Sequence, residues 1–170
     1  MRCRGSRLKV QTYREPAAWA EGDPLDPRET LDKEEAHRRG LLHRSVHLLL
    51  FDEDGRLHAR RRSDDDARYA GLWTSTVGTH VAAGDVDERT LRAIVPPETA
   101  LARVGEFRVK DDAENEVCGL FASRSPEARR ILGPAHAALA PEEVEAAIRE
   151  GRTTPHLAEG WRRYRAAGAG

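Results

Sequence analysis

The segment at residues 45–62 limits the fold more than any other part of the chain. It begins with an apolar run, SVHLLLFD, which stops at the sequence EDG, and a second run, RLHARRR, follows directly. Two such runs on either side of an Asp-Gly sequence are typical of two strands joined by a tight turn. We therefore expect a β-hairpin over these residues, together with a sheet to which it belongs.

Helices and further strands are expected on both sides of the hairpin. The composition turns helical over residues 32–39, and Gly40 follows where a helix end favours glycine. A helix over residues 85–94 must end before Pro96-Pro97, because proline in a helix interior costs about 3 kcal/mol. The other predicted elements are strands at 8–13, 69–73, 76–81, 104–110 and 116–123, and helices at 141–150 and 157–167. Strands and helices mix without a βαβ rhythm, which predicts an α+β fold.

Length and charge narrow the class of protein. The 170 residues suit one domain, for which we expect an N-terminal extension with a short strand at residues 1–30 and the main domain at 31–170. The 28 Lys and Arg nearly balance the 29 Asp and Glu, so a net charge of −1 predicts no general attraction to nucleic acid or anionic membranes. Two cysteines make no disulfide framework, and no apolar stretch suits a signal peptide or a membrane span. These features predict a soluble, cytoplasmic protein, and they leave the oligomeric state open.

Three histidines and two glutamates stand where a compact fold could bring them together. His37 ends the first predicted helix, His43 precedes the apolar strand, and His80 lies in the segment GTHVAAG. Glu114 and Glu116 are two residues apart, and such side chains point to the same side of a strand. Imidazoles and carboxylates together suit zinc, manganese or iron, whereas three nitrogen ligands favour magnesium less. One interpretation is a divalent-metal site, and the other is a solvated strand edge that carries two acids.

Longer strings of residues carry a resemblance to a known family. LHRSVHLLLFDEDGRLHARRRS and YAGLWTSTVGTHVAAG, followed by ENEVC, are similar to Nudix domains of the type I isopentenyl-diphosphate isomerases, and the resemblance covers residues 30–165. It implies the Nudix fold, in which a mixed β-sheet is sandwiched between helices, and a Nudix-like domain at residues 31–170. It also implies a set of metal ligands, namely His37, His43, His80, Glu114 and Glu116.

The resemblance also implies a reaction. The isomerases move a double bond in a five-carbon diphosphate by protonating the alkene on one face and removing a proton from the other. Glu116 then matches the acid or proton relay, and the face of Trp161 would stabilise the carbocation, although Trp161 can equally be a helix residue that packs on the sheet. The expected partner is a small diphosphate substrate, which can bring a magnesium ion of its own. Its diphosphate would be bound by the basic residues Lys33, Arg62 and Arg92, with Arg68 as a further match.

Several positions depart from the family pattern. Gly78 stands where the family has its catalytic cysteine, and Val109 stands where a tyrosine assists proton transfer. Asp66 and Ala67 replace a pair of lysines after the arginine run. The glutamate-rich Nudix helix is either degenerate, with Glu98 alone matched, or deleted, and the two prolines before Glu98 favour a deletion.

The pattern therefore leaves three functions open. The first is an isomerase of isoprenoid biosynthesis in which another group, with Ser75, Thr76 and Thr79 as candidates, replaces the thiol. The second is a Nudix hydrolase of another diphosphate, and the third is a metal-binding Nudix-fold protein with repurposed chemistry. The remaining histidines match no position of the pattern, so we expect them to be structural or exposed: His47, His58, His136 and His156.

Overall fold

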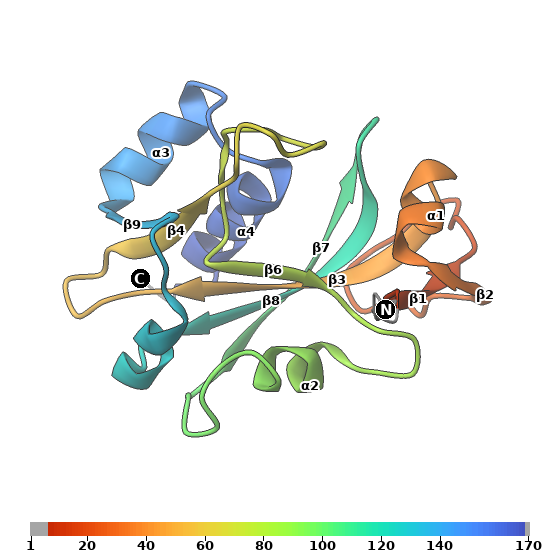
Figure 1. Cartoon of the computed structure of the whole chain (residues 1–170), viewed down its shortest axis with the longest axis horizontal. Helices are drawn as coiled ribbons and strands as arrows, with labels where there is room; N and C mark the ends of the chain where they lie inside the picture. The colour runs from red at the N-terminus through yellow and green to blue at the C-terminus, as the bar shows by residue number, and fades with distance from the viewer. Residues whose placement is uncertain (1–6, 169–170) are drawn as a thin grey trace, which may run out of the picture.

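A six-stranded mixed sheet runs through the centre of the molecule in the computed structural model, which describes residues 7–168 (Figure 1). The order along the sheet is β2-β1-β3-β8-β7, and β6 pairs with β3. β3 runs parallel to β8, and the other pairings in this sheet are antiparallel. The strands are β1 (Lys9–Tyr13), β2 (Pro27–Asp32), β3 (Leu42–Leu50), β6 (Val77–His80), β7 (Ala102–Lys110) and β8 (Asn115–Ser123).

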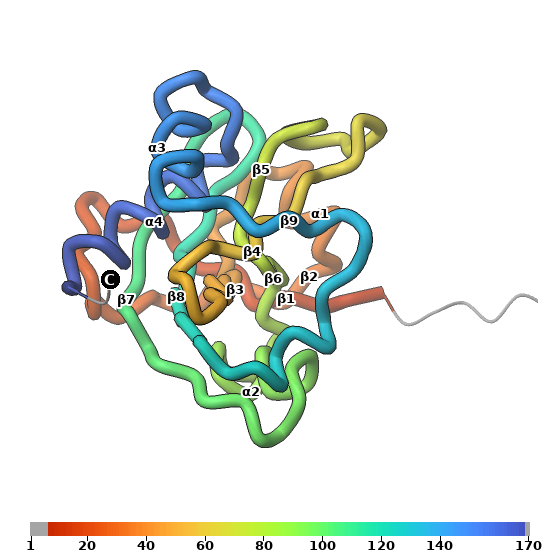
Figure 2. Tube along the Cα trace, turned by 90° about the vertical axis from the view of Figure 1, so that its left-hand side faces the viewer, coloured from red at the N-terminus to blue at the C-terminus, as the bar shows by residue number. Residues whose placement is uncertain are grey.

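A smaller sheet and the helices complete the fold. In the smaller sheet β4 (Leu57–Arg61) lies between β5 (Trp73–Thr74) and β9 (His136–Leu139). The helices α3 and α4 lie on one side of the main sheet and α2 on the other, as Figures 1 and 2 show. The helices are α1 (Lys33–Arg38), α2 (Asp87–Arg92), the 3-10 helix η1 (Pro126–Ile131), α3 (Pro141–Arg149) and α4 (Pro155–Ala166). The structure thus has a mixed sheet between helices, which is the architecture predicted from the sequence.

The two faces of the main sheet pack on different hydrophobic clusters. Successive side chains of a strand point to opposite faces. From β3, Val46 and Leu48 pack with Leu91 of α2, whereas Leu49 packs on the other face with Trp161 of α4. This alternation places the odd-numbered residues of β3, including His43, on the face that α4 covers.

The expected β-hairpin at residues 45–62 is wrong in its pairing. The two strands and the turn form, but beyond a single bridge between Phe51 and Leu57 the strand β4 leaves β3 and joins the smaller sheet. The reason is that both edges of β3 are taken, one by β8 and the other by β1 and β6. The second strand therefore has no free edge of β3 to join.

Most of the other predicted elements are present with shifted ends. The strands predicted at 8–13, 104–110 and 116–123 form, as do both C-terminal helices, and α2 ends before Pro96 as expected. β2 and β9 were not predicted, and only Trp73 of the extended segment predicted at 69–73 lies in a strand. The domain boundary at residue 30 stays a prediction, and residues 1–6 of the expected extension lie outside the described residues. Among those described, no helix is long and apolar enough to cross a membrane.

Candidate metal centre

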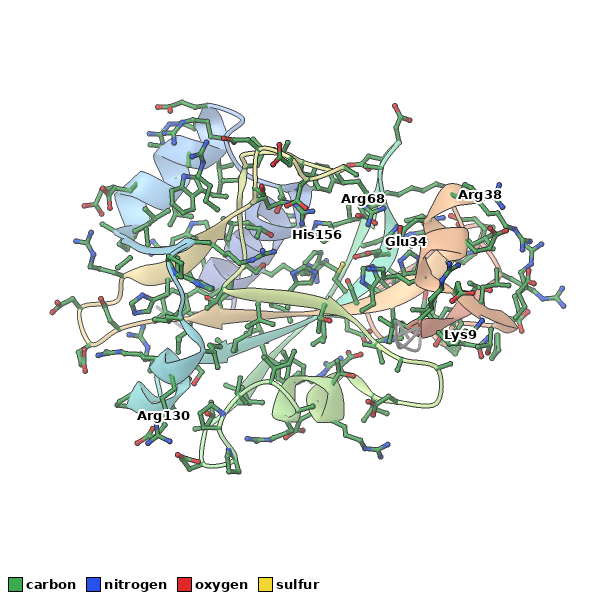
Figure 3. The ribbon with its side chains drawn as sticks, in the orientation of Figure 1. Lys9, Glu34, Arg38, Arg68, Arg130 and His156 are labelled. Carbon is green, nitrogen blue, oxygen red and sulfur yellow. The ribbon has the colours of Figure 1, made fainter. Side chains whose placement is uncertain are left out.

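The five predicted ligands come together at one point of the molecule. His37 is on α1, His43 on β3 and His80 at the end of β6, while Glu114 and Glu116 flank the start of β8. Strand pairing sets part of this arrangement, because the register places His43 beside Glu116 and Ser45 beside His80. One ligand atom of each of the five residues lies within 4.8 Å of the others. The labelled side chains of Glu34, Arg68 and His156 surround this region in Figure 3.

The distances within the centre are short. His43 Nε2 and His80 Nε2 lie 3.3 and 3.1 Å from Glu116 Oε1. His37 Nδ1 lies 3.0 Å from Glu114 Oε2, and its Nε2 lies 2.9 Å from His80 Nε2. The three imidazoles and two carboxylates therefore present a shared set of nitrogen and oxygen atoms to a volume of the size of one ion.

Three of these atoms fit a bound cation better than a hydrogen-bond network. His37 Nδ1, His43 Nε2 and Glu114 Oε2 are buried and have no well-oriented hydrogen-bond partner among the described residues. A buried polar atom without a hydrogen-bond partner costs about 1–3 kcal/mol. A divalent ion bound between these three atoms would offset that cost. His43 also donates from Nδ1 to the Leu41 carbonyl at 2.7 Å, which leaves Nε2 as the ligand atom. The donor set suits zinc, manganese or iron.

Burial and neighbouring charges adjust the protonation of the centre. Burial raises the pKa of Glu116, but the neighbouring imidazoles of His156, His43 and His80 outweigh it and hold the pKa well below its usual value. Burial lowers the pKa of His80, and the opposing effect of Glu116 does not reverse it. Burial also disfavours charged His43, yet the nearby Glu116 carboxylate raises the pKa overall. An ionised Glu116 and a neutral His80 are the forms that bind a metal ion.

A second cluster, which the sequence analysis missed, adjoins the first through Glu116. His156 Nε2 on α4 donates to Glu116 Oε2 at 3.0 Å, and Ser45 Oγ donates to the same oxygen at 2.6 Å. His47 links to Ser45 Oγ through Nε2 at 3.3 Å and to Ser75 Oγ through Nδ1 at 3.1 Å. Both histidines are buried, whereas we expected them to be structural or exposed.

The second cluster is a hydrogen-bond network rather than another metal site. Its ligand types, His47, Glu116, Cys118 and His156, could hold an ion. However, Ser45 Oγ lies within hydrogen-bond distance of His47, Glu116 and Cys118, so a hydroxyl already occupies the middle of the cluster. Burial also raises the pKa of the Cys118 thiol well above its usual value, which disfavours the thiolate that metals bind.

His47 takes the space beside Gly78, the position that the resemblance aligns with the catalytic cysteine of the isomerase family. β3 and β6 pair His47 with Gly78, and a Cβ atom at Gly78 would lie 2.9 Å from His47 Cε1. Burial, with the nearby His156 as the second cause, lowers the pKa of His47 to about 3, so its imidazole is neutral near pH 7. The alternation of β3 puts His43, Ser45 and His47 on one face, which is the signal that could have revealed His47; nothing comparable marked His156.

A small cavity of about 60 Å³ lies between the metal centre and the smaller sheet. It is lined mainly by polar side chains, including Ser45, His47, Arg60, Thr74, Glu116 and His156. This volume has room for a few atoms, so a whole substrate could enter it only with a movement of the side chains.

Comparisons with known proteins fit this arrangement. No family model matches the chain. It is 32% identical over 118 residues to the isopentenyl-diphosphate Delta-isomerase of Escherichia coli O1:K1 / APEC, and 34% identical to that of Shigella flexneri serotype 5b; each match covers 62% of this chain and 64% of the relative. The chain thus matches less than two thirds of the length of these relatives.

Solved structures match more of the chain than these relatives do. DR0079 from Deinococcus radiodurans superposes with a TM-score of 0.68 at 20% identity, covering 91% of this chain and 98% of the other. A mutT/nudix family protein from Listeria innocua gives a TM-score of 0.55 at 17% identity, over 74% and 92% of the two chains. The chain has the Nudix fold. The predicted fold class is confirmed, as is the predicted resemblance to the isopentenyl-diphosphate isomerases.

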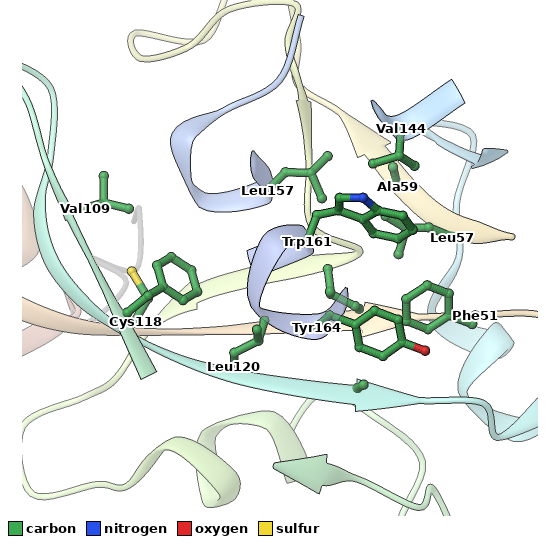
Figure 4. Close-up of a cluster of buried hydrophobic side chains, with 13 residues drawn as sticks. Phe51, Leu57, Ala59, Val109, Cys118, Leu120, Val144, Leu157, Trp161 and Tyr164 are labelled. Atoms are coloured by element: carbon green, nitrogen blue, oxygen red, sulfur yellow. The ribbon is translucent and has the colours of Figure 1, made fainter. Parts of the chain in front are cut away.

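Two residues expected at the site lie elsewhere in this Nudix fold. Trp161 is only 4% exposed and packs with Phe51 and Tyr164 in the core, as Figure 4 shows, and it does not line the cavity. Arg92 is on α2, across the main sheet, where it donates to the Thr99 carbonyl at 2.6 Å. For Trp161 the structure agrees with the alternative interpretation, a helix residue that packs on the sheet. The position of Arg92 did not follow from the sequence, because the sheet face that α2 covers is set by tertiary packing.

The other expected phosphate-binding residues are already engaged. Arg62 lines the cavity, but its Nε donates to the Arg68 carbonyl at 2.9 Å and lies 3.4 Å from Asp66. Arg68 Nε lies 2.9 Å from Glu114 Oε1, and Lys33 pairs with Glu34 at 3.1 Å. The cations that the resemblance assigned to a diphosphate are thus partly neutralised by this chain's own acids.

The segment that would hold the Nudix helix contains only the short α2. Its acids are committed to other partners, since Asp87 pairs with Arg44 and Glu88 with Arg92. Neither acid lines the cavity. Within the described residues, α2 therefore offers no carboxylate for a substrate-borne magnesium ion.

Proposed function

We propose that this chain is a metal-dependent Nudix-fold enzyme of the isopentenyl-diphosphate isomerase type, which moves a double bond in a small diphosphate by protonating its alkene. The position of Glu116 supports this most directly. Its Oε1 faces His43 and His80, whereas its Oε2 accepts hydrogen bonds from His156 and Ser45 beside the cavity. One carboxylate thus belongs both to the candidate metal centre and to a proton-carrying network.

The chain's own residues can hold and move the proton. His156 carries a proton at Nε2, 3.0 Å from Glu116 Oε2, and this pair is the donor to the alkene. His47, neutral and next to Gly78, replaces the missing thiol as acceptor at Nδ1. A proton from His47 Nε2 can return through Ser45 Oγ to Glu116 and on to His156, which restores the donor pair. His47 is then neutral with its remaining proton on Nδ1, and exchange of that proton with solvent resets the ring. A divalent ion bound by the five ligands would supply the positive charge that keeps Glu116 in place.

Turnover of isopentenyl diphosphate in deuterated water tests the proposal. The purified, metal-loaded protein should form the allylic isomer and introduce deuterium, as followed by NMR. Glu116→Gln should lower the rate by about 10²-fold or more, because it removes the proton-transferring group. The conservative control Glu88→Gln, on the exposed face of α2, should retain the rate. Metal-loaded protein that leaves isopentenyl diphosphate unchanged would rule out the isomerase function.

The polar cavity favours one alternative, a metal-dependent enzyme with repurposed chemistry. The cavity is bordered by His47, Thr74 and His156, while Trp161 lies in the core, so an apolar five-carbon tail would find little apolar surface there. In that case isopentenyl diphosphate should be inert, while a more polar diphosphate is converted. A panel of nucleotide and sugar diphosphates, followed by phosphorus NMR, separates this alternative and ordinary hydrolysis from the isomerase.

A further inference from the structure

Arg60 is the cation of the cavity that has no partner among the described residues. It projects from β4 of the smaller sheet, where its register neighbour on β5 is Thr74, and both side chains line the cavity. Among residues 7–168 it makes no hydrogen bond or ion pair, whereas Arg62 beside it is held by Asp66 and the Arg68 carbonyl. Arg60 is also partly buried. A partly buried guanidinium without an acceptor is costly, and an oxyanion is the group that best satisfies its five donors.

The surroundings of Arg60 are suited to a ligand oxyanion. The Thr74 hydroxyl accepts from Thr154 at 3.1 Å, which leaves its own proton available to an acceptor. Thr79 lines the same cavity from the opposite sheet. Two acids line the cavity, and both have other partners. Glu116 is engaged by three histidines and Ser45, and Glu114 by His37 and Arg68, so neither forms an ion pair with Arg60.

We propose that Arg60 binds a phosphoryl oxyanion of the substrate inside the cavity, from the side of the smaller sheet. This inference rests on the proposed function, because it takes the substrate to be a diphosphate. It assigns the anion-binding role to Arg60, rather than to Arg62, which is paired with Asp66, or to Arg92, which lies across the main sheet. The anionic group of the substrate then lies on the side of the cavity formed by the smaller sheet, and the metal centre borders the cavity through Glu114, Glu116 and His80.

The neighbour Arg61 provides a matched control. It is one residue away on the same strand, points away from the cavity, and is occupied by Asp64 at 3.2 Å and the Gly71 carbonyl at 3.1 Å. Arg60→Gln and Arg61→Gln remove the same charge from positions 60 and 61. A comparison of the two variants thus separates a direct contact from a general loss of positive charge.

Binding of inorganic pyrophosphate to the metal-loaded protein, measured by titration calorimetry, tests the inference. Arg60→Gln should weaken binding roughly tenfold or more, Arg60→Lys by less, and Arg61→Gln hardly at all. Equal affinity for wild type and Arg60→Gln would overturn the inference, as would equal weakening by Arg61→Gln or failure of the wild type to bind pyrophosphate. Acetate as a second ligand checks the chemistry, because binding of acetate as tight as that of pyrophosphate would overturn the phosphoryl assignment.

The outcome is independent of turnover. A protein that binds pyrophosphate in an Arg60-dependent manner but does not isomerise isopentenyl diphosphate keeps this inference and loses the proposed function. If the wild type isomerises isopentenyl diphosphate but Arg60→Gln binds pyrophosphate as well as the wild type does, the proposed function stands and this inference is lost.

Discussion

Gly78 and His47 form a pair in which each residue requires the other. The His47 ring is held by Ser45 and Ser75 and is buried, so it cannot swing away from a new side chain at position 78. Gly78→Ala would place a Cβ atom 2.9 Å from His47 Cε1 and should destabilise the fold by about 1–3 kcal/mol. In a His47→Ala background the same substitution should cost much less. Urea unfolding of the two single variants and the double variant measures this coupling.

Gly133→Ala is the control for that cycle, because a Cβ atom at Gly133 would meet nothing within 4 Å. It should leave the free energy of unfolding nearly unchanged. If Gly78→Ala costs the same with and without the His47 ring, the two residues are not in contact in the way described.

At the scale of single residues, the sequence predicted that the five candidate ligands lie together, but it did not predict which other side chains surround them. His37, His43, His80, Glu114 and Glu116 meet because each lies on or next to an element whose position the local pattern predicted. Their role as ligands stays a prediction. His156 was missed because its distance from Glu116 depends on how α4 docks, and nothing in the sequence near Pro155 indicates that docking.

At the scale of elements, a charged network fixes α2 to the main sheet. Arg44 of β3 contacts Asp87 of α2 at 2.6 Å and Glu106 of β7 at 2.7 Å. Burial lowers the pKa of Arg44, but the bonds to both acids outweigh it and raise the pKa overall, so the guanidinium is charged in the folded protein. Gly119 of β8 provides the room, because a Cβ atom there would overlap the Asp87 carboxylate.

Asp87→Asn should therefore destabilise the protein by roughly 2 kcal/mol, since a partly buried guanidinium loses one of its two charged acceptors. Chemical denaturation followed by circular dichroism measures the change. Glu88→Gln, one residue along the same helix and paired only with Arg92 across the helix surface, should change stability by less than about 0.5 kcal/mol. Equal effects of the two substitutions would mean that Asp87 does not anchor α2.

The elements also show where sequence patterns stop being sufficient. Strand identity follows from apolar alternation, and β3, β7 and β8 were predicted in this way. Strand pairing does not follow, because whether β4 can join β3 depends on β1, β6 and β8, which come from distant parts of the chain. β9 was missed for a related reason: its four residues are only partly buried and pair with β4 at long range.

At the scale of the whole molecule, the candidate metal centre joins segments that are far apart in sequence. It draws on α1, β3, β6 and β8, so an ion bound there would link residues 37, 43, 80 and 116. A ligand that binds only the folded state stabilises it by about 3–4 kcal/mol at 100 to 1,000 times its Kd. Treatment with a chelator should then lower the Tm by on the order of 10 °C.

The variant His43→Ala should already melt at the lower temperature and show little further response to the chelator. Differential scanning calorimetry of both proteins, with metal content measured by mass spectrometry, checks this. The predicted metal centre would be wrong if the wild-type protein contained no metal after loading, or if the chelator left its Tm unchanged.

The buried His47 predicts how the whole fold responds to acid. Its pKa is lowered to about 3 in the folded protein, chiefly by burial, against a usual value of 6.5 in the unfolded chain. As the pH falls below 6.5, the unfolded chain gains a proton that the folded protein does not, so stability decreases until the pH approaches 3. At 1.36 kcal/mol per pKa unit, the loss of stability from this one group between pH 7 and pH 5 is about 2 kcal/mol.

The variant His47→Gln should not show that part of the loss, whereas other titrating groups contribute equally to both proteins. Urea unfolding at the two pH values, with a chelator present throughout so that metal loss is not counted, compares the two slopes. If wild type and His47→Gln lose the same stability, then the pKa of His47 is not lowered in the folded protein, which would contradict the desolvated imidazole described beside Gly78.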